Sequence, residues 1–375
     1  MLRPNKFAAE QFDETFTDAL ELEDSISQRV IEAVLPQLTE NEKQKIKKRG
    51  TDNHEAFEAY LRGRHYWNTF TEEGFAKALI YYNRAISIAP DYALAYAGIA
   101  DYYNLLGIYA VMPFQETSAA AKEAAQKAVT LDENLAEGYA ALGFAVLMRD
   151  FDWAQAEKHL RRAVELNPNY VTGLIWYCCF LGVKGESEEA LKQIRHALKL
   201  DPLTPIVPHT LNLTLYYAGN FEEAIAGGER LVEREPRYGL AQLFLSSVMW
   251  KVGRTDEAVR LANRAVLLLG RTPHSLAWLT SAYAASGETG KARDLIAEIE
   301  ESSVRRYVSP YLLAVAYANL RDTEKTLELL EKAAEIRDGR LIWLGVDPQF
   351  DELRGHPRFD KVLRKTNNPL VAAHV

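Results

Sequence analysis

Few residues of this chain could do chemistry, and their spacing favours packing over catalysis. Cys178 and Cys179 are the two cysteines of the sequence and stand side by side; thiolates can act as nucleophiles or as metal ligands. No histidine lies close to them in the sequence, and a buried cysteine without such partners behaves as a small apolar side chain. We therefore expect the cysteines to have a packing role.

The eight histidines are scattered along the chain, and their spacing matches no metal-binding motif. A metal site built from one local segment is therefore disfavoured, while a site assembled from distant segments stays an alternative. The histidines are His54, His65, His159, His196, His209, His274, His356 and His374.

One glycine-containing stretch, Gly287-x-x-Gly290-Lys291, is superficially similar to a phosphate-binding loop. Its spacing is wrong, and Ala292 stands where a serine or threonine would hold magnesium. The basic run from Lys43 to Arg49 could contact phosphate, but such a run is typical of a solvated helix end. Because no hydrolase or kinase motif occurs either, we expect a non-enzymatic protein with no catalytic residue, no metal and no cofactor.

Composition and charge narrow the class of protein further. The 50 alanines, set against 21 glycines and 14 prolines, favour helix over strand. A net charge of −8 gives the whole molecule no attraction to nucleic acid or to an anionic membrane. No apolar run is long enough to span a membrane, and the first residues lack the apolar core of a signal peptide. We expect a cytoplasmic location, or a periplasmic one if a longer parent protein has an upstream transmembrane helix.

The elements that position these residues follow a repeat of 34 residues. Pro168, Pro202 and Pro236 stand 34 residues apart, and each follows an apolar helical run. Small residues and glycines at this spacing indicate pairs of antiparallel helices, because small side chains let two helices approach and glycine permits the turn between them. Two such sets are Gly185, Gly219, Gly253 and Gly287, and Ala190, Ala224, Ala258 and Ala292.

The pattern resembles the tetratricopeptide repeat, whose signature is W-x₂-L-G-x₂-Y…A-x₃-F…P. One good copy contains Ala141-Leu142-Gly143, Ala156, Leu160, Ala163 and Pro168. The resemblance implies an all-α fold, namely a right-handed superhelix (an α-solenoid) of about eight helix-turn-helix repeats. We place this array at residues 51–340 and a C-terminal helical cap and tail at residues 341–375, since terminal repeats need a cap.

Residues 1–50 do not follow the repeat. The segments Glu10–Asp18 and Leu22–Ser27 resemble the end of a TolB amino-terminal-like region, so we expect a short α/β remnant and a linker helix here. Phe151–Glu157 and Val346–Arg354 fit the same family. In that family the array follows an output module: a winged-helix DNA-binding domain, a nucleotide cyclase or a serine/threonine kinase. The resemblance therefore implies that an N-terminal output domain is missing from this chain.

The concave groove formed by the first helices of stacked repeats is the most informative surface. Its positions do not carry the lysine, arginine and asparagine set of families that grip a peptide's terminal carboxylate. Aromatic residues, which are favoured anchors at interfaces, are expected there instead, while ordinary packing between helices stays an alternative. The predicted groove residues are Phe144, Trp176, Tyr216, Tyr217, Phe244, Trp250 and Trp278.

Two functional hypotheses follow from this pattern. The first is a scaffold for protein–protein interaction, whose groove binds a partner helix, a peptide or an adjacent domain. The second is the regulatory or sensory C-terminal region of a longer bacterial transcriptional regulator, cyclase or kinase. In that case the partner is the chain's own missing output domain, and neither hypothesis involves direct binding of nucleic acid by this chain.

Overall fold

The computed structural model describes residues 50–68, 72–109 and 112–374. The expected α/β remnant and the basic run Lys43–Arg49 lie outside these residues. From Asn53 onward the chain forms one compact unit, and no strand occurs in its described part. Among the described helices, none is long and apolar enough to cross a membrane.

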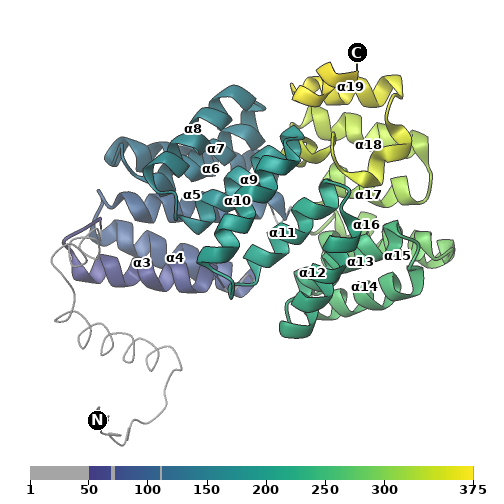
Figure 1. The fold of residues 1–375 in the computed structure, drawn as a ribbon, viewed down its shortest axis with the longest axis horizontal. Helices are drawn as coiled ribbons and strands as arrows, with labels where there is room; N and C mark the ends of the chain where they lie inside the picture. Colours follow the sequence, from purple (N-terminus) through teal and green to yellow (C-terminus); the bar gives the residue numbers. More distant parts are fainter. Residues whose placement is uncertain (1–49, 69–71, 110–111, 375) are drawn as a thin grey trace, which may run out of the picture. The chain divides into compact units, whose positions relative to one another are not determined.

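Sixteen of the described helices form eight consecutive antiparallel pairs, as the 34-residue pattern predicts (Figure 1). In chain order the pairs are α3 (His54–Trp67) with α4 (Glu72–Ile88), α5 (Ala93–Ile108) with α6 (Phe114–Leu131), α7 (Ala136–Asp150) with α8 (Trp153–Leu166), α9 (Val171–Lys184) with α10 (Ser187–Leu200), α11 (Ile206–Tyr217) with α12 (Phe221–Arg234), α13 (Gly239–Lys251) with α14 (Thr255–Leu269), α15 (Pro273–Ala285) with α16 (Thr289–Ser302), and α17 (Pro310–Asn319) with α18 (Thr323–Glu335).

The repeated residues act where the pattern places them. Gly185 and Gly287 adopt φ values of +88° and +84° in the turns that follow α9 and α15, a left-handed conformation that glycine adopts without steric cost. Ala190 and Ala292 are completely buried between the helices. An added Cβ at Gly143 would lie 2.7 Å from the Leu160 side chain, which explains why small residues are needed where the helices of a pair touch.

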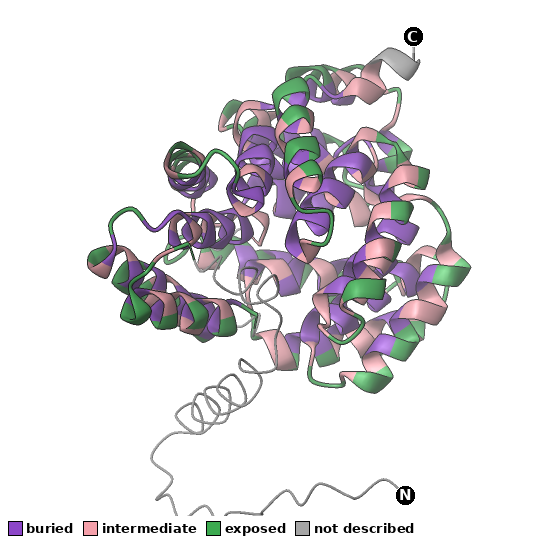
Figure 2. Cartoon of the chain, turned by 60° about the vertical axis from the view of Figure 1, so that its left-hand side comes forward, coloured by how far each residue is buried: buried purple, intermediate pink, exposed green. Residues whose placement is uncertain are grey.

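The first helices of successive pairs also contact one another, from α3 through α17, and form a continuous inner layer. Their apolar residues are buried on the faces turned toward neighbouring helices (Figure 2). A helix buried on more than one side carries apolar residues around most of its surface, and α9 fits this description, since ten of its fourteen residues are buried. The second helices are amphipathic and carry acidic residues in their first turns, such as Glu189 and Glu223, where the helix dipole favours negative charge.

After α18 the chain leaves the repeat. Four short helical elements follow: η2 (Gly339–Trp343), η3 (Pro348–Leu353), α19 (Pro357–Lys365) and η4 (Pro369–His374). Their apolar side chains are buried, including Phe350 and Phe359. The contacts of these elements differ from those of a cap that covers the last helix pair alone, and they create the candidate site described next. The boundaries proposed at residues 50 and 340 stay a prediction.

Candidate functional site

Residues 336–371, called the closing segment below, run across the inner layer of helices. Within it, η2 packs against α5 and α7, η3 packs against α17, and α19 packs against α18. The fit at η2 is close: an added Cβ at Gly339 would overlap the ring of Phe114 and the end of the Met148 side chain. The closing segment therefore contacts both an early and a late part of the array.

Hydrogen bonds attach the far end of the closing segment to the third helix pair. The Trp153 indole Nε1 donates to the main-chain oxygen of Thr366 over 2.8 Å. The Asn367 side-chain amide donates to the main-chain oxygen of Phe151 over 3.4 Å. Trp153 and Thr366 are both buried, so water cannot readily replace their bond.

Arg340 lies at the centre of the closing segment and is only 7% exposed. Its guanidinium donates to the main-chain oxygen of Ile108, at the end of α5. The same group lies over the rings of Trp278 and Tyr311, 5.8 Å and 5.5 Å from their centroids. A buried guanidinium that faces two aromatic rings is held by cation–π attraction, so Arg340 connects the beginning of the array to its end.

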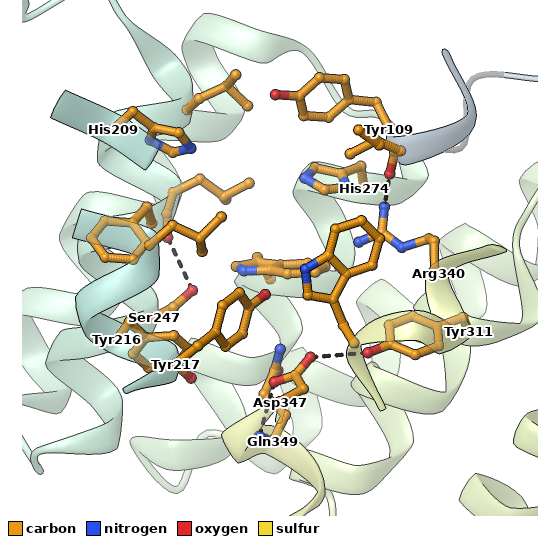
Figure 3. Close-up of a pocket in the computed structure, with 17 residues that line it drawn as sticks. Tyr109, His209, Tyr216, Tyr217, Ser247, His274, Tyr311, Arg340, Asp347 and Gln349 are labelled. Carbon is orange, nitrogen blue, oxygen red and sulfur yellow. Dashed lines mark hydrogen bonds between the residues drawn. The ribbon is translucent and has the colours of Figure 1, made fainter. Parts of the chain in front are cut away.

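A cavity of about 120 Å³ lies beside Arg340, between the inner helices α11, α13 and α15 and the closing segment (Figure 3). Aromatic side chains make up much of its wall, and Trp343 and Asp347 of the closing segment complete it. Asp347 accepts hydrogen bonds from the Tyr311 hydroxyl and the Gln349 main-chain N–H, each over 3.1 Å. Burial raises the pKa of Asp347 against the opposing effect of these donors.

Four hydrogen-bonding atoms of the residues that line this cavity are buried and have no partner in the protein. They are the Nδ1 atoms of His209 and His274, the hydroxyl of Tyr216 and the Nε of Arg340. Burial lowers the pKa of His209 to about 4, and burial together with Arg340 lowers that of His274, so both rings are neutral at pH 7. Each buried polar atom without a partner costs about 1–3 kcal/mol, which makes this concentration of four atoms notable.

A second polar cluster occupies the inner layer nearer the beginning of the array. Asp101 is buried, accepts a 3.0 Å hydrogen bond from the Trp176 indole, and lies 3.7 Å from the Arg64 guanidinium. Burial raises the pKa of Asp101 to about 6, with Arg64 opposing the shift. The ring of Trp176 stacks on Phe144, with centroids 4.3 Å apart. This cluster ties the first, second, third and fourth helix pairs together.

No family model matches the chain. Among solved structures, it superposes on yeast Tom70 with a TM-score of 0.50 and 14% identity, over 93% of this chain and 78% of Tom70. It also superposes on a chain of the Cut9–Hcn1 hetero-tetramer of the APC/C with a TM-score of 0.53 and 15% identity, over 78% of this chain and 52% of that one. Both are tetratricopeptide-repeat structures. The chain has the tetratricopeptide-repeat fold.

Curated proteins provide one further likeness. The chain is 28% identical over 172 residues to the transcriptional regulator HilA of Salmonella typhimurium. The matched part is 46% of this chain and spans about a third of HilA, namely 31% of its length.

The predicted groove residues of the tetratricopeptide-repeat array fall into three places. Tyr216, Tyr217, Phe244 and Trp278 line the central cavity. Trp250 lies apart, in a surface pocket that the closing segment helps to form. Their assignment as partner-binding residues stays a prediction.

Phe144 and Trp176 form the third place and are buried in the cluster around Asp101. Phe144 is 0% exposed and Trp176 is 3% exposed. Their spacing correctly places them on inner helices, but in this conformation their rings contact each other. A partner could reach these two rings only after the inner layer opened.

Several residues of the cavity were not expected from the repeat pattern. His209 and His274 attracted attention only as isolated histidines, and Arg340 and Asp347 fell at the boundary of the array and in the cap. The available signal was the loss of register after Glu335 together with charged residues among apolar ones, as in Arg340-Leu341-Ile342-Trp343. Such a signal indicates burial of a charge but does not identify its partners.

The other candidates from the sequence have structural surroundings. The Cys178 sulfur is buried, lies 3.2 Å from the Thr214 hydroxyl, and has a pKa raised to about 12 by burial, so it is a thiol at pH 7. Gly287 forms the turn after α15, and Ala292 packs in α16. Within the described residues no group of three or more His, Cys, Asp or Glu side chains could hold a metal ion.

Proposed function

We propose that this chain is a non-enzymatic interaction module whose concave inner layer binds a protein partner, either a helix, a peptide or an adjacent domain. The observation that carries the proposal is that the inner layer already binds polypeptide, because the closing segment lies along it. Helices α5 and α7 contact η2, and Arg340 of that element donates to a main-chain oxygen of α5. A surface that binds an irregular segment of its own chain has the shape and the hydrogen-bonding groups to bind another.

The similarity of fold supports the same reading. The solved structure of Cut9–Hcn1 is a hetero-tetramer, so a comparable array takes part in a protein assembly there. In this chain, the proposed contact residues are the seven aromatic side chains predicted above. Tyr217 and Trp278 are half-buried, and they are the members of the set that a partner reaches by displacing η2 and η3.

Site-specific photo-crosslinking in the native cell tests this proposal. A photoreactive amino acid replaces Trp278 on the inner layer or, as the matched control, Leu267, which is 77% exposed on α14. We expect a discrete crosslinked partner from the inner position and none from α14. Crosslinks only within the chain, or equal capture at both positions, would contradict binding on the inner layer.

A second candidate function is favoured by the HilA match. In that hypothesis the chain is the regulatory part of a longer bacterial transcriptional regulator, and its partner is the output domain of the same protein. The proposal places both parts in the cytoplasm. Reading the genomic DNA upstream of the codon for Met1 tests it: an in-frame winged-helix segment supports the hypothesis, and an in-frame stop codon without such a segment contradicts it.

A further inference from the structure

The central cavity contains a set of polar atoms that the protein itself does not satisfy. His209 is 9% exposed, Tyr216 is 3% exposed, and Arg340 is 7% exposed, yet each has an atom without a hydrogen-bond partner. Folded proteins pair the great majority of such buried atoms with protein groups or ordered molecules. Because these atoms belong to side chains from α11 and from η2 that line the same space (Figure 3), a single occupant could satisfy them together.

The charge of Arg340 indicates the chemistry of that occupant. In the described part of the chain, no carboxylate lies within 4 Å of its guanidinium, and its Nε donates to nothing. A buried guanidinium binds an oxyanion best, through charge-assisted hydrogen bonds. The nearby carboxyl of Asp347 is already engaged by Tyr311 and Gln349, which leaves Arg340 available to a ligand.

The size and the walls of the cavity restrict the occupant further. An apolar cavity of about 150 Å³ takes up benzene, so a cavity of about 120 Å³ suits a molecule with a single ring or a short aliphatic chain. The rings of Tyr216, Phe244 and Trp278 supply apolar wall around this space. The two neutral imidazoles can each donate or accept one hydrogen bond at the ligand.

A route from the surface adjoins the cavity. A wider depression of about 610 Å³ lies on the other side of Tyr109 and His274, and these two residues and Leu240 line both spaces. The rings of Tyr109 and His274 meet edge to face, with centroids 5.6 Å apart. Rotation of these two side chains would connect the depression to the cavity without any movement of the helices.

We propose that this cavity is a binding site for a small organic carboxylate, with the carboxylate at Arg340 and the apolar part against Tyr216 and Trp278. The site lies where the closing segment meets the inner helices, so an occupant contacts both. This inference goes beyond the proposed interaction function and does not depend on it, since a ligand can bind whether or not a protein partner does.

Titration of the full chain with benzoate and butyrate tests the proposal, with calorimetry and tryptophan fluorescence as readouts. Trp278 and Trp343 line the cavity, so their emission reports occupation. We expect saturable binding of at least one acid. Benzamide, which has the shape of benzoate without its charge, should bind roughly tenfold more weakly, because charged hydrogen bonds are about twice as strong as neutral ones.

Two variants make the outcome specific to the cavity. Arg340→Met should abolish the preference for benzoate over benzamide. If that variant fails to fold, Tyr216→Phe serves instead: it removes a hydroxyl that has no partner, so it should keep the fold and bind the acid several-fold more weakly. Tyr92→Phe is the matched control, because the Tyr92 hydroxyl is also buried without a partner but belongs to a different cluster, and binding should not change.

Three results would overturn the proposal. They are the absence of saturable binding for both acids, equal affinity for benzoate and benzamide, and unchanged affinity in Tyr216→Phe. A crystal structure grown with benzoate that shows only ordered water at Arg340 and His209 would also overturn it.

Discussion

The indole of Trp153 and the main-chain oxygen of Thr366 are joined by a 2.8 Å hydrogen bond across 213 positions of sequence. In a solenoid, each repeat ordinarily contacts only its neighbours, and stability is close to a sum of local terms. This bond does not belong to that scheme, because it connects the third helix pair to the closing segment. The array is therefore held at both ends of its inner layer.

Replacing Trp153 by phenylalanine should loosen the closing segment. The change leaves the buried oxygen of Thr366 without its donor, and such a loss costs about 1–3 kcal/mol. Urea unfolding should show this decrease, and hydrogen exchange should rise in residues 362–371. Tyr92→Phe is the control, since it removes no hydrogen bond. Unchanged exchange in the segment would show that the Trp153 bond does not hold it.

Replacing Gly339 by alanine should destabilise the protein by steric overlap. The new methyl group would meet Phe114 and Met148, and overpacking of this kind costs about 1–3 kcal/mol. Gly290→Ala is the matched control, because nothing lies within 4 Å of its added Cβ in α16, so it should be neutral or stabilising. Equal free energies of unfolding for the two variants would contradict the close fit of η2.

Asp101 should make the protein less stable as the pH rises. Its folded-state pKa of about 6 exceeds the ordinary value of 3.8, so the unfolded chain releases this proton first. Between pH 4 and pH 6 the free energy of unfolding should therefore fall, by up to about 3 kcal/mol for a shift of this size. The Asp101→Asn variant should lack this component. Parallel pH profiles for variant and parent would rule it out.

His209 should have the opposite effect in an overlapping range. Burial lowers its folded-state pKa to about 4, so below pH 6.5 the unfolded chain binds a proton that the folded chain does not. The free energy of unfolding contributed by this group is complete above pH 6.5 and is lost as the pH falls toward 4. Denaturation at stepped pH should show a smaller loss at acid pH in His209→Gln, and an unchanged loss would exclude His209 as its source.

Removing residues 341–375 should cause aggregation. The deletion takes away Trp343, Asp347 and the buried Phe350, and it uncovers apolar residues of the inner layer, including Tyr311. Large uncovered apolar surfaces promote association. Light scattering should detect large species, with the complete chain as the control. A monodisperse and fully helical truncated protein would refute this expectation.

The helix pairs could be predicted from sequence because each depends on local rules. Gly185 and Gly287 fix turns, and Ala190 and Ala292 fix contacts within a pair, so a period of 34 residues is enough to recover them. The position of Arg340 beside Ile108 follows from no such rule. It depends on the accumulated curvature of all the pairs between them, to which each residue contributes little.

The candidate site could be predicted only in part for the same reason. Tyr216 and Trp278 were expected on the inner layer from their place in the repeat, and they line the cavity there. Trp176 was expected on the same layer, but its burial depends on Asp101, which belongs to a repeat 75 positions away. A one-dimensional pattern identifies the layer and does not show what covers it.

The bond between Trp153 and Thr366 also has a consequence for synthesis. A ribosome makes Trp153 213 residues before Thr366, and repeats can fold as they emerge because their contacts are local. During that interval the inner layer stands uncovered, with its aromatic side chains open to any polypeptide nearby. The nascent chain thus passes through a stage at which the closing segment must compete with other proteins for its own groove.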